Sequence, residues 1–150
     1  MDLTLPLDHA AIERILLHRY PFLLVDRVTE LEIDKRIVGI KNVSRNDHFL
    51  SHDASGASVF PPTLLTEAIA QVGAILILAK PENRQRLPLL AGIKRFRFRR
   101  PVLPGEVIEM EAHVIRLGSR MGVLEGVARV DGKVVANGTM TCALGPARST

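Results

Sequence analysis

The sequence is poor in the residues that build disulfides and metal centres. Cys142 is the single cysteine among 150 residues, so no disulfide can form within the chain and a reducing cytoplasm is the expected location. Neither the CxxC nor the HExxH spacing occurs and the histidines are scattered, so we expect no metal site. The first ten residues lack the basic and apolar regions of a signal peptide.

Low-complexity segments and internal repeats are also missing. The composition, 47% hydrophobic and 24% charged, is that of a globular chain long enough to bury a core. We therefore expect a single domain over residues 1–150. The net charge of +4, carried by more arginine than lysine, favours an acidic partner. It is modest and no known nucleic-acid-binding motif accompanies it, so we do not expect nucleic acid.

The most apolar stretch, residues 59–79, predicts a buried helix. Pro61 and Pro62 mark the expected start of this helix. Proline has no backbone N–H, and the N–H groups of the first helical turn have no partner within the helix, so proline is tolerated there. The residues after them leave no wide polar face, which is typical of burial. A length of about 17 residues is marginal for a membrane span, and Glu67 and Gln71 lie within it, so we expect no membrane insertion. These two side chains share a face, and a buried carboxylate is costly unless it is paired or used.

The remaining chain predicts one short helix and an antiparallel sheet. Asp8 can cap a helix over residues 8–17, and Asp131-Gly132 is the signal of a tight hairpin. A sheet curved around the central helix would bury that helix on most of its surface, which is an α+β architecture. Residues 44–58 form a polar loop ahead of the helix. The expected strands cover residues 22–28, 31–43, 89–99, 107–117, 121–130 and 133–144.

Several segments, in order along most of the chain, resemble the 3-hydroxyacyl-carrier-protein dehydratases of fatty acid synthesis. They are ILLHRYPFLLVDRV, KNVSRNDHF, PPTLLTEAIAQVGA, LLAGIKRFRFRRPVLPGEVIEMEAHV and VDGKVVANGTMTCAL. The resemblance implies the hotdog fold and a hydro-lyase acting on thioesters of acyl carrier protein or coenzyme A. It also implies a homodimer with two sites at its interface, which in this family often assembles further into a trimer of dimers.

The chain departs from this family in the catalytic loop. The family typically reads Gly-His-Phe-Pro-Gly, followed after a short gap by Met-Pro-Gly, whereas this chain reads SHDASGASVFPP. Without a gap, the family's histidine falls on Asp53 and its first glycine on His52. With one residue inserted before Gly56, His52 takes the histidine position. The family's acid falls on Glu67 in both alignments, and its glycine after proline falls on Pro62.

Dehydration needs a base for the proton beside the carbonyl, an acid for the departing hydroxyl and donors for the thioester oxygen. The resemblance assigns the base to His52, or to Asp53, and the acid to Glu67 of the partner subunit, with no cofactor or metal. Pro62 has no N–H, and losing one oxyanion donor costs roughly 3 kcal/mol. The backbone and hydroxyl of Thr63 are the expected substitutes. Further substrate-binding candidates are Gly56, Phe60 and Gln71.

Two other functions remain open on the same fold. The carboxylates of Asp53 and Glu67 suit an acyl thioesterase, which would release free thiol instead of an enoyl thioester. The altered loop also suits a degenerate partner subunit that binds an acyl carrier without turnover. In a regular strand, Arg95, Arg97 and Arg99 share one face and could dock an acidic carrier or its phosphate, although a solvated face is an equally good interpretation. His18 and His48 are expected to be structural or surface residues.

Overall fold

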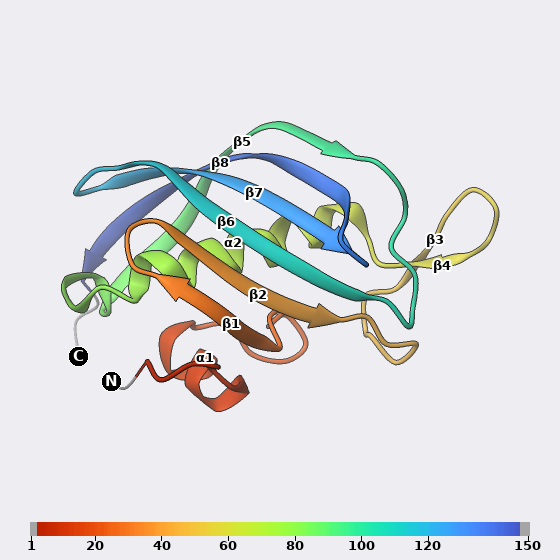
Figure 1. Ribbon diagram of the computed structural model, residues 1–150, viewed down its shortest axis with the longest axis horizontal. Coiled ribbons are helices and arrows are strands. Elements are labelled where there is room, and N and C mark those ends of the chain that lie inside the picture. The colour runs from red at the N-terminus through yellow and green to blue at the C-terminus, as the bar shows by residue number, and fades with distance from the viewer. Residues whose placement is uncertain (1–2, 148–150) are drawn as a thin grey trace.

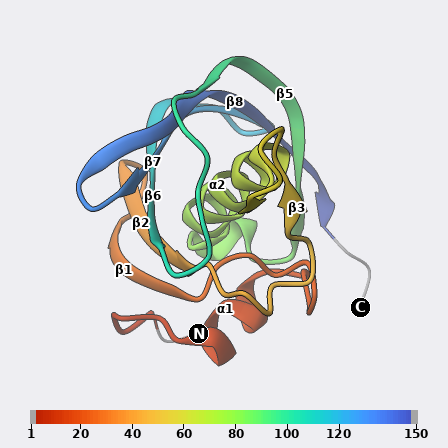
Figure 2. The same cartoon turned by 90° about the vertical axis from the view of Figure 1, so that its right-hand side faces the viewer.

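The computed structural model describes residues 3–147, which form a long helix inside a curved sheet (Figure 1). The elements are α1 (His9–Ile15), β1 (Arg27–Glu32), β2 (Arg36–Asn42), β3 (Ser51–His52), β4 (Ser58–Val59), α2 (Pro62–Leu78), the 3-10 turn η1 (Pro81–Asn83), β5 (Arg86–Phe98), β6 (Val107–Leu117), β7 (Met121–Val130) and β8 (Lys133–Ala147). Six strands form an antiparallel sheet in the order β1-β2-β6-β7-β8-β5. Figure 2 shows this sheet curving around α2 from β1 to β5, which confirms the expected architecture.

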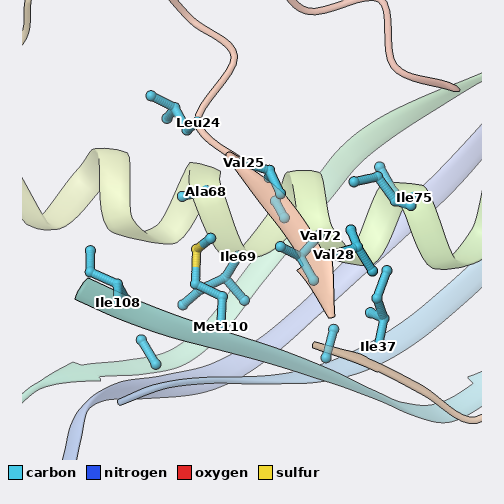
Figure 3. Packing of buried hydrophobic residues seen from close by; sticks show 14 of the residues in the cluster. Leu24, Val25, Val28, Ile37, Ala68, Ile69, Val72, Ile75, Ile108 and Met110 are labelled. Atoms are coloured by element: carbon cyan, nitrogen blue, oxygen red, sulfur yellow. The ribbon is translucent and has the colours of Figure 1, made fainter. Parts of the chain in front are cut away.

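The buried helix occurs where the sequence predicted it. Pro61 is the N-cap of α2 and Pro62 is its first residue. Ile69, Val72 and Ile75 have no exposed surface and pack against strands of the sheet (Figure 3). Burying each such side chain contributes roughly 1.5–3 kcal/mol, so the helix is held by its apolar surface. No helix within residues 3–147 is long and apolar enough to cross a membrane.

The N-terminal elements agree in part with expectation. Asp8 caps α1, because its carboxylate accepts a 2.8 Å hydrogen bond from the N–H of Ala11. The strand expected from residue 22 begins only at Arg27, which corrects the sequence-based boundary. Residues before it lie against α2 instead, and the N–H of Leu24 donates to Gln71 Oε1 at 2.8 Å. The Gln71 side chain thus supplies the hydrogen-bond acceptor that a neighbouring strand would otherwise provide for this backbone N–H.

Other strand boundaries also differ from those predicted. The expected strand of residues 31–43 is interrupted by a turn at Asp34, whose φ is 65°. At the C-terminus, β8 continues to Ala147 because that residue pairs with Arg86 at the start of β5. The sequence GPARST, residues 145–150, predicts a frayed tail; this is wrong for residues 145–147, which belong to β8, and residues 148–150 lie outside the described residues. The Asp131-Gly132 hairpin is confirmed, since both residues have positive φ.

β5 is irregular where its basic residues lie. Its pairing with β8 shifts between Lys94 and Arg97, and Arg95 lies within this bulge with a φ of 55°. The strand ends before Arg99. A bulge breaks the alternation of side chains along a strand. The prediction that Arg95, Arg97 and Arg99 share one face of a regular strand was therefore wrong, although all three are exposed.

Gly138 of β8 permits the close approach of β5 at this bulge. A Cβ atom at Gly138 would lie 2.7 Å from the Cα and 2.3 Å from the Cδ2 of Phe96. The Cα of Phe96 belongs to the backbone, so no change of side-chain rotamer can relieve the contact with it. The ladder between β5 and β8 therefore requires a residue without a side chain here.

We expect Gly138→Ala to lower the free energy of unfolding by roughly 1–3 kcal/mol, the cost of overpacking. Urea unfolding followed by circular dichroism measures the change. Gly92→Ala is the matched control in the same ladder, because its nearest neighbour would be Thr141 Cβ at 3.7 Å. Equal losses in the two variants would contradict the interpretation.

Candidate functional site

Glu67 lies on the second turn of α2 at the edge of the core, with 23% of its side chain exposed. Its Oε1 accepts a 2.9 Å hydrogen bond from Gln71 Nε2, one helical turn further along. Gln71 is 1% exposed and also donates to the carbonyl of Phe22 while accepting from the N–H of Leu24, each at 2.8 Å. These backbone partners determine which end of the amide faces Glu67. The carboxyl group is thus held by a side chain that is itself fully bonded.

His18 is the second titratable residue beside this carboxyl group. Its Nε2 lies 3.4 Å from Glu67 Oε1, and 30% of its side chain is exposed. Arg19 stabilises the local turn, because its guanidinium donates to the carbonyls of Leu16, His18 and Glu13 at 2.8, 2.8 and 3.0 Å. The His18 Nδ1 atom is buried and has no hydrogen-bond partner among the described residues.

Glu67 and His18 open into a cavity of about 220 Å³. The wall beyond the polar residues is mostly apolar and comes from α2, β5 and β8. Cys142 is part of that wall, and burial raises the pKa of its thiol to about 11. The remaining lining residues are Ala70, Gln71, Ala74, Pro88, Leu89 and Leu90.

His52 and Asp53 lie on a separate segment, the two-stranded pair of β3 and β4 that extends from the sheet near the start of α2 (Figure 1). A carboxylate oxygen of Asp53 accepts hydrogen bonds from the hydroxyl and N–H of Ser55 and from the N–H of Ala57, at 2.6, 2.8 and 3.0 Å. The Ser55 hydroxyl, followed by these backbone groups, lowers the pKa of Asp53. The carboxylate therefore closes the loop and is a weak base.

A second cavity, of about 440 Å³, lies against this segment. It brings together four of the predicted site residues: His52, Asp53, Phe60 and Pro62. Arg99 from the predicted carrier-binding set also lines it. The other lining residues are Ser51, Val59, Phe98, Arg100 and Pro101.

The predicted site residues therefore fall into two groups in one chain. Glu67 and Gln71 line the first cavity, whereas His52 and Asp53 line the second. No hydrogen bond or ion pair joins the two groups within residues 3–147. Of the remaining candidates, Thr63 is exposed in the first turn of α2, Gly56 lies in the loop with a φ of 84°, and Arg95 and Arg97 line neither cavity.

Sequence reasoning did not bring His18 to the candidate site. It was expected to be a structural or surface residue, and the structure places it beside Glu67, with 30% of its side chain exposed. A signal was present in the sequence, because His18 lies in the HRYPF stretch that carries part of the family resemblance. The spacing of the two residues along the chain gave no sign of contact.

Comparisons of structure agree with the hotdog arrangement. A chain of the dehydratase heterocomplex ApeI:P from Xenorhabdus doucetiae superposes with a TM-score of 0.77 at 20% identity, over 90% of this chain and 91% of that one. The conserved protein PA5202 from Pseudomonas aeruginosa superposes with a TM-score of 0.68 at 20% identity, over 88% and 97%. At these identities the likeness establishes the fold alone, and it confirms the predicted hotdog class.

Comparisons of sequence establish the family. A sequence model of the FabA-like domain matches residues 16–139. Proteins named 3-hydroxyacyl-[acyl-carrier-protein] dehydratase FabZ are 47% identical in Bacillus velezensis and 48% in Bacillus subtilis, over 93% of this chain and 99% of each relative. The relative of that name in Moorella thermoacetica is 48% identical over 93% of this chain and 97% of its own length. This chain therefore belongs to the FabA-like domain family, within which its relatives are the FabZ dehydratases.

Proposed function

We propose that this protein removes water from 3-hydroxyacyl thioesters of acyl carrier protein in fatty acid biosynthesis. The observation that carries the proposal is the carboxyl group of Glu67, which is held by Gln71 and lines a mostly apolar cavity. An acid is needed there to protonate the departing hydroxyl group. The names of the relatives support the same reaction. Because the chemistry is proton transfer, we expect neither a cofactor nor a metal, and we place the reaction in the cytoplasm.

A dimer across β5 fits this proposal. β5 is an edge strand of the sheet, and Leu89, Leu90 and Ile93 on it are 48%, 38% and 54% exposed. Free edges with exposed apolar side chains favour pairing with another strand. A second copy paired along β5 would cover the cavity of Glu67. The β3–β4 segment of that copy, with His52 and Asp53, would then supply the remaining candidates for the base.

The exposed basic residues on and beside β5 suit an acidic carrier. Arg95, Arg97 and Arg99 are all exposed, and Arg99 lines the second cavity together with Arg100. Arginine pairs well with carboxylate and phosphate groups, and both are features of a carrier bearing a phosphopantetheine arm. We propose that this end of the molecule docks the carrier, with the acyl group reaching the cavity of Glu67.

We expect Glu67→Gln to lower kcat for dehydration by roughly 10²–10⁴-fold, since the amide cannot donate the proton that the reaction needs. The measurement follows enoyl absorbance and free thiol together on a 3-hydroxyacyl thioester of acyl carrier protein. Glu109→Gln on β6 is the control, because Glu109 is exposed and lines neither cavity. A Glu67→Gln enzyme with nearly normal kcat would refute the role, and Glu67-dependent thiol release would indicate a thioesterase.

Cys142 reports on the contents of the cavity. We expect its alkylation by iodoacetamide to be slow near pH 8 and to accelerate about tenfold per pH unit towards pH 11, because burial raises the thiol pKa to about 11 and the thiolate is the nucleophile. A long-chain acyl carrier should slow this reaction by filling the cavity, whereas carrier without its pantetheine arm should not. Mass spectrometry of the modified protein measures the rates. Equal rates with both carriers would place the acyl chain elsewhere.

A further inference from the structure

We propose that Lys41 is a positioning residue for the β3–β4 segment, which carries His52 and Asp53. The inference rests on the proposed dehydratase function and adds a residue to it. Lys41 lies on β2 and is only 6% exposed. A buried ammonium group is costly unless it is paired, so its partners account for its place in the fold. They lie at both ends of residues 44–60, the connection between β2 and α2 that contains the β3–β4 segment.

The first contact of Lys41 is at the entry to this connection. Its Nζ atom donates to Asp47 Oδ1 at 2.8 Å and to the carbonyl of Asn42 at 2.7 Å. The other carboxylate oxygen of Asp47 accepts from the N–H of Ser44 at 2.6 Å. The side chains of Lys41 and Asp47 are 8% and 19% exposed, so water screens the pair weakly. The turn that leads the chain out of β2 is therefore closed on Lys41.

The second contact of Lys41 is at the exit from the connection. Its Nζ atom lies 5.9 Å from the centre of the Phe60 ring, within the range of a cation–π interaction. Phe60 follows β4 directly, and its N–H donates to the carbonyl of Val102 at 2.8 Å. Phe60 also lines the cavity that His52 and Asp53 line. One ammonium group thus contacts both ends of the connection.

The β3–β4 segment depends on its ends for its position. β3 and β4 pair with each other in a two-stranded sheet separate from the six-stranded one, and they extend from the body of the molecule (Figure 1). A two-stranded pair has little stability of its own. The restraint from Lys41 acts on every residue of the segment and is present in each copy of a dimer, because its contacts lie within one chain. A displacement of about 1 Å at a reacting group can cost about 10²-fold in rate.

The test compares Lys41→Met with the double variant Lys41→Met/Asp47→Asn, using the intact protein and a 3-hydroxyacyl thioester of acyl carrier protein. We expect Lys41→Met to unfold at lower urea concentration, because the carboxylate of Asp47 loses its partner, and to lower kcat about 10–10²-fold with little change in KM. The double variant leaves no unpaired charge, and its amide can still accept from Ser44. We therefore expect it to regain stability while kcat stays low.

Hydrogen–deuterium exchange measures the restraint directly, and we expect residues 44–60 to exchange faster in both variants than in wild type. Lys80→Met is the matched control, because Lys80 pairs with Asp34 at 2.7 Å and lines neither cavity. Its kcat and its exchange over residues 44–60 should equal those of wild type.

The outcomes separate this inference from the proposed function. If the double variant regains both stability and kcat, Lys41 has a structural role alone, which overturns the inference while Glu67-dependent turnover of wild type upholds the function. A normal kcat in folded Lys41→Met also overturns the inference, and so does a raised KM at unchanged kcat, which would assign Lys41 to binding. If Lys41→Met fails to fold, kcat of the double variant decides. A wild-type protein without turnover overturns both proposals.

Discussion

The structure depends on burying a long helix that carries one carboxyl group. The apolar side chains of α2 supply the core, and the same enclosure requires partners for the polar atoms of Glu67 and Gln71. Gln71 satisfies this requirement by bonding to the backbone before β1 and to Glu67 at once. The hydrogen bonds that satisfy the buried polar atoms of Gln71 therefore also hold the carboxyl group of Glu67 beside the cavity.

The curved sheet has a further consequence at its edge. Wrapping the strands around α2 leaves β5 with one unpaired side, and its apolar residues lie beside the cavity of Glu67. A strand edge of this kind is a template for pairing. The proposed dimer would satisfy the edge and close the cavity in one step, so that assembly and substrate enclosure have the same physical origin.

The departures from the family lie around the site and leave the scaffold intact. Asp53 stands at the family's histidine position in the ungapped alignment, and its carboxylate organises the loop through three hydrogen bonds. Pro62 is the first residue of α2, a position that suits the fixed φ of proline, but it has no N–H to donate to a ligand. A shared fold does not fix the chemistry of its site. Glu67 and Gln71, by contrast, match the family and line one cavity together.

The sequence by itself determined the buried helix, β6, β7 and the Asp131-Gly132 hairpin, because local periodicity, proline placement and turn residues encode such elements. It also determined the family, through motifs in a consistent order. Only the tertiary structure decided the bulge in β5, the late start of β1 and the neighbours of Glu67. These features depend on contacts between segments far apart in the chain, and local patterns carry no record of which side chains such contacts bring together.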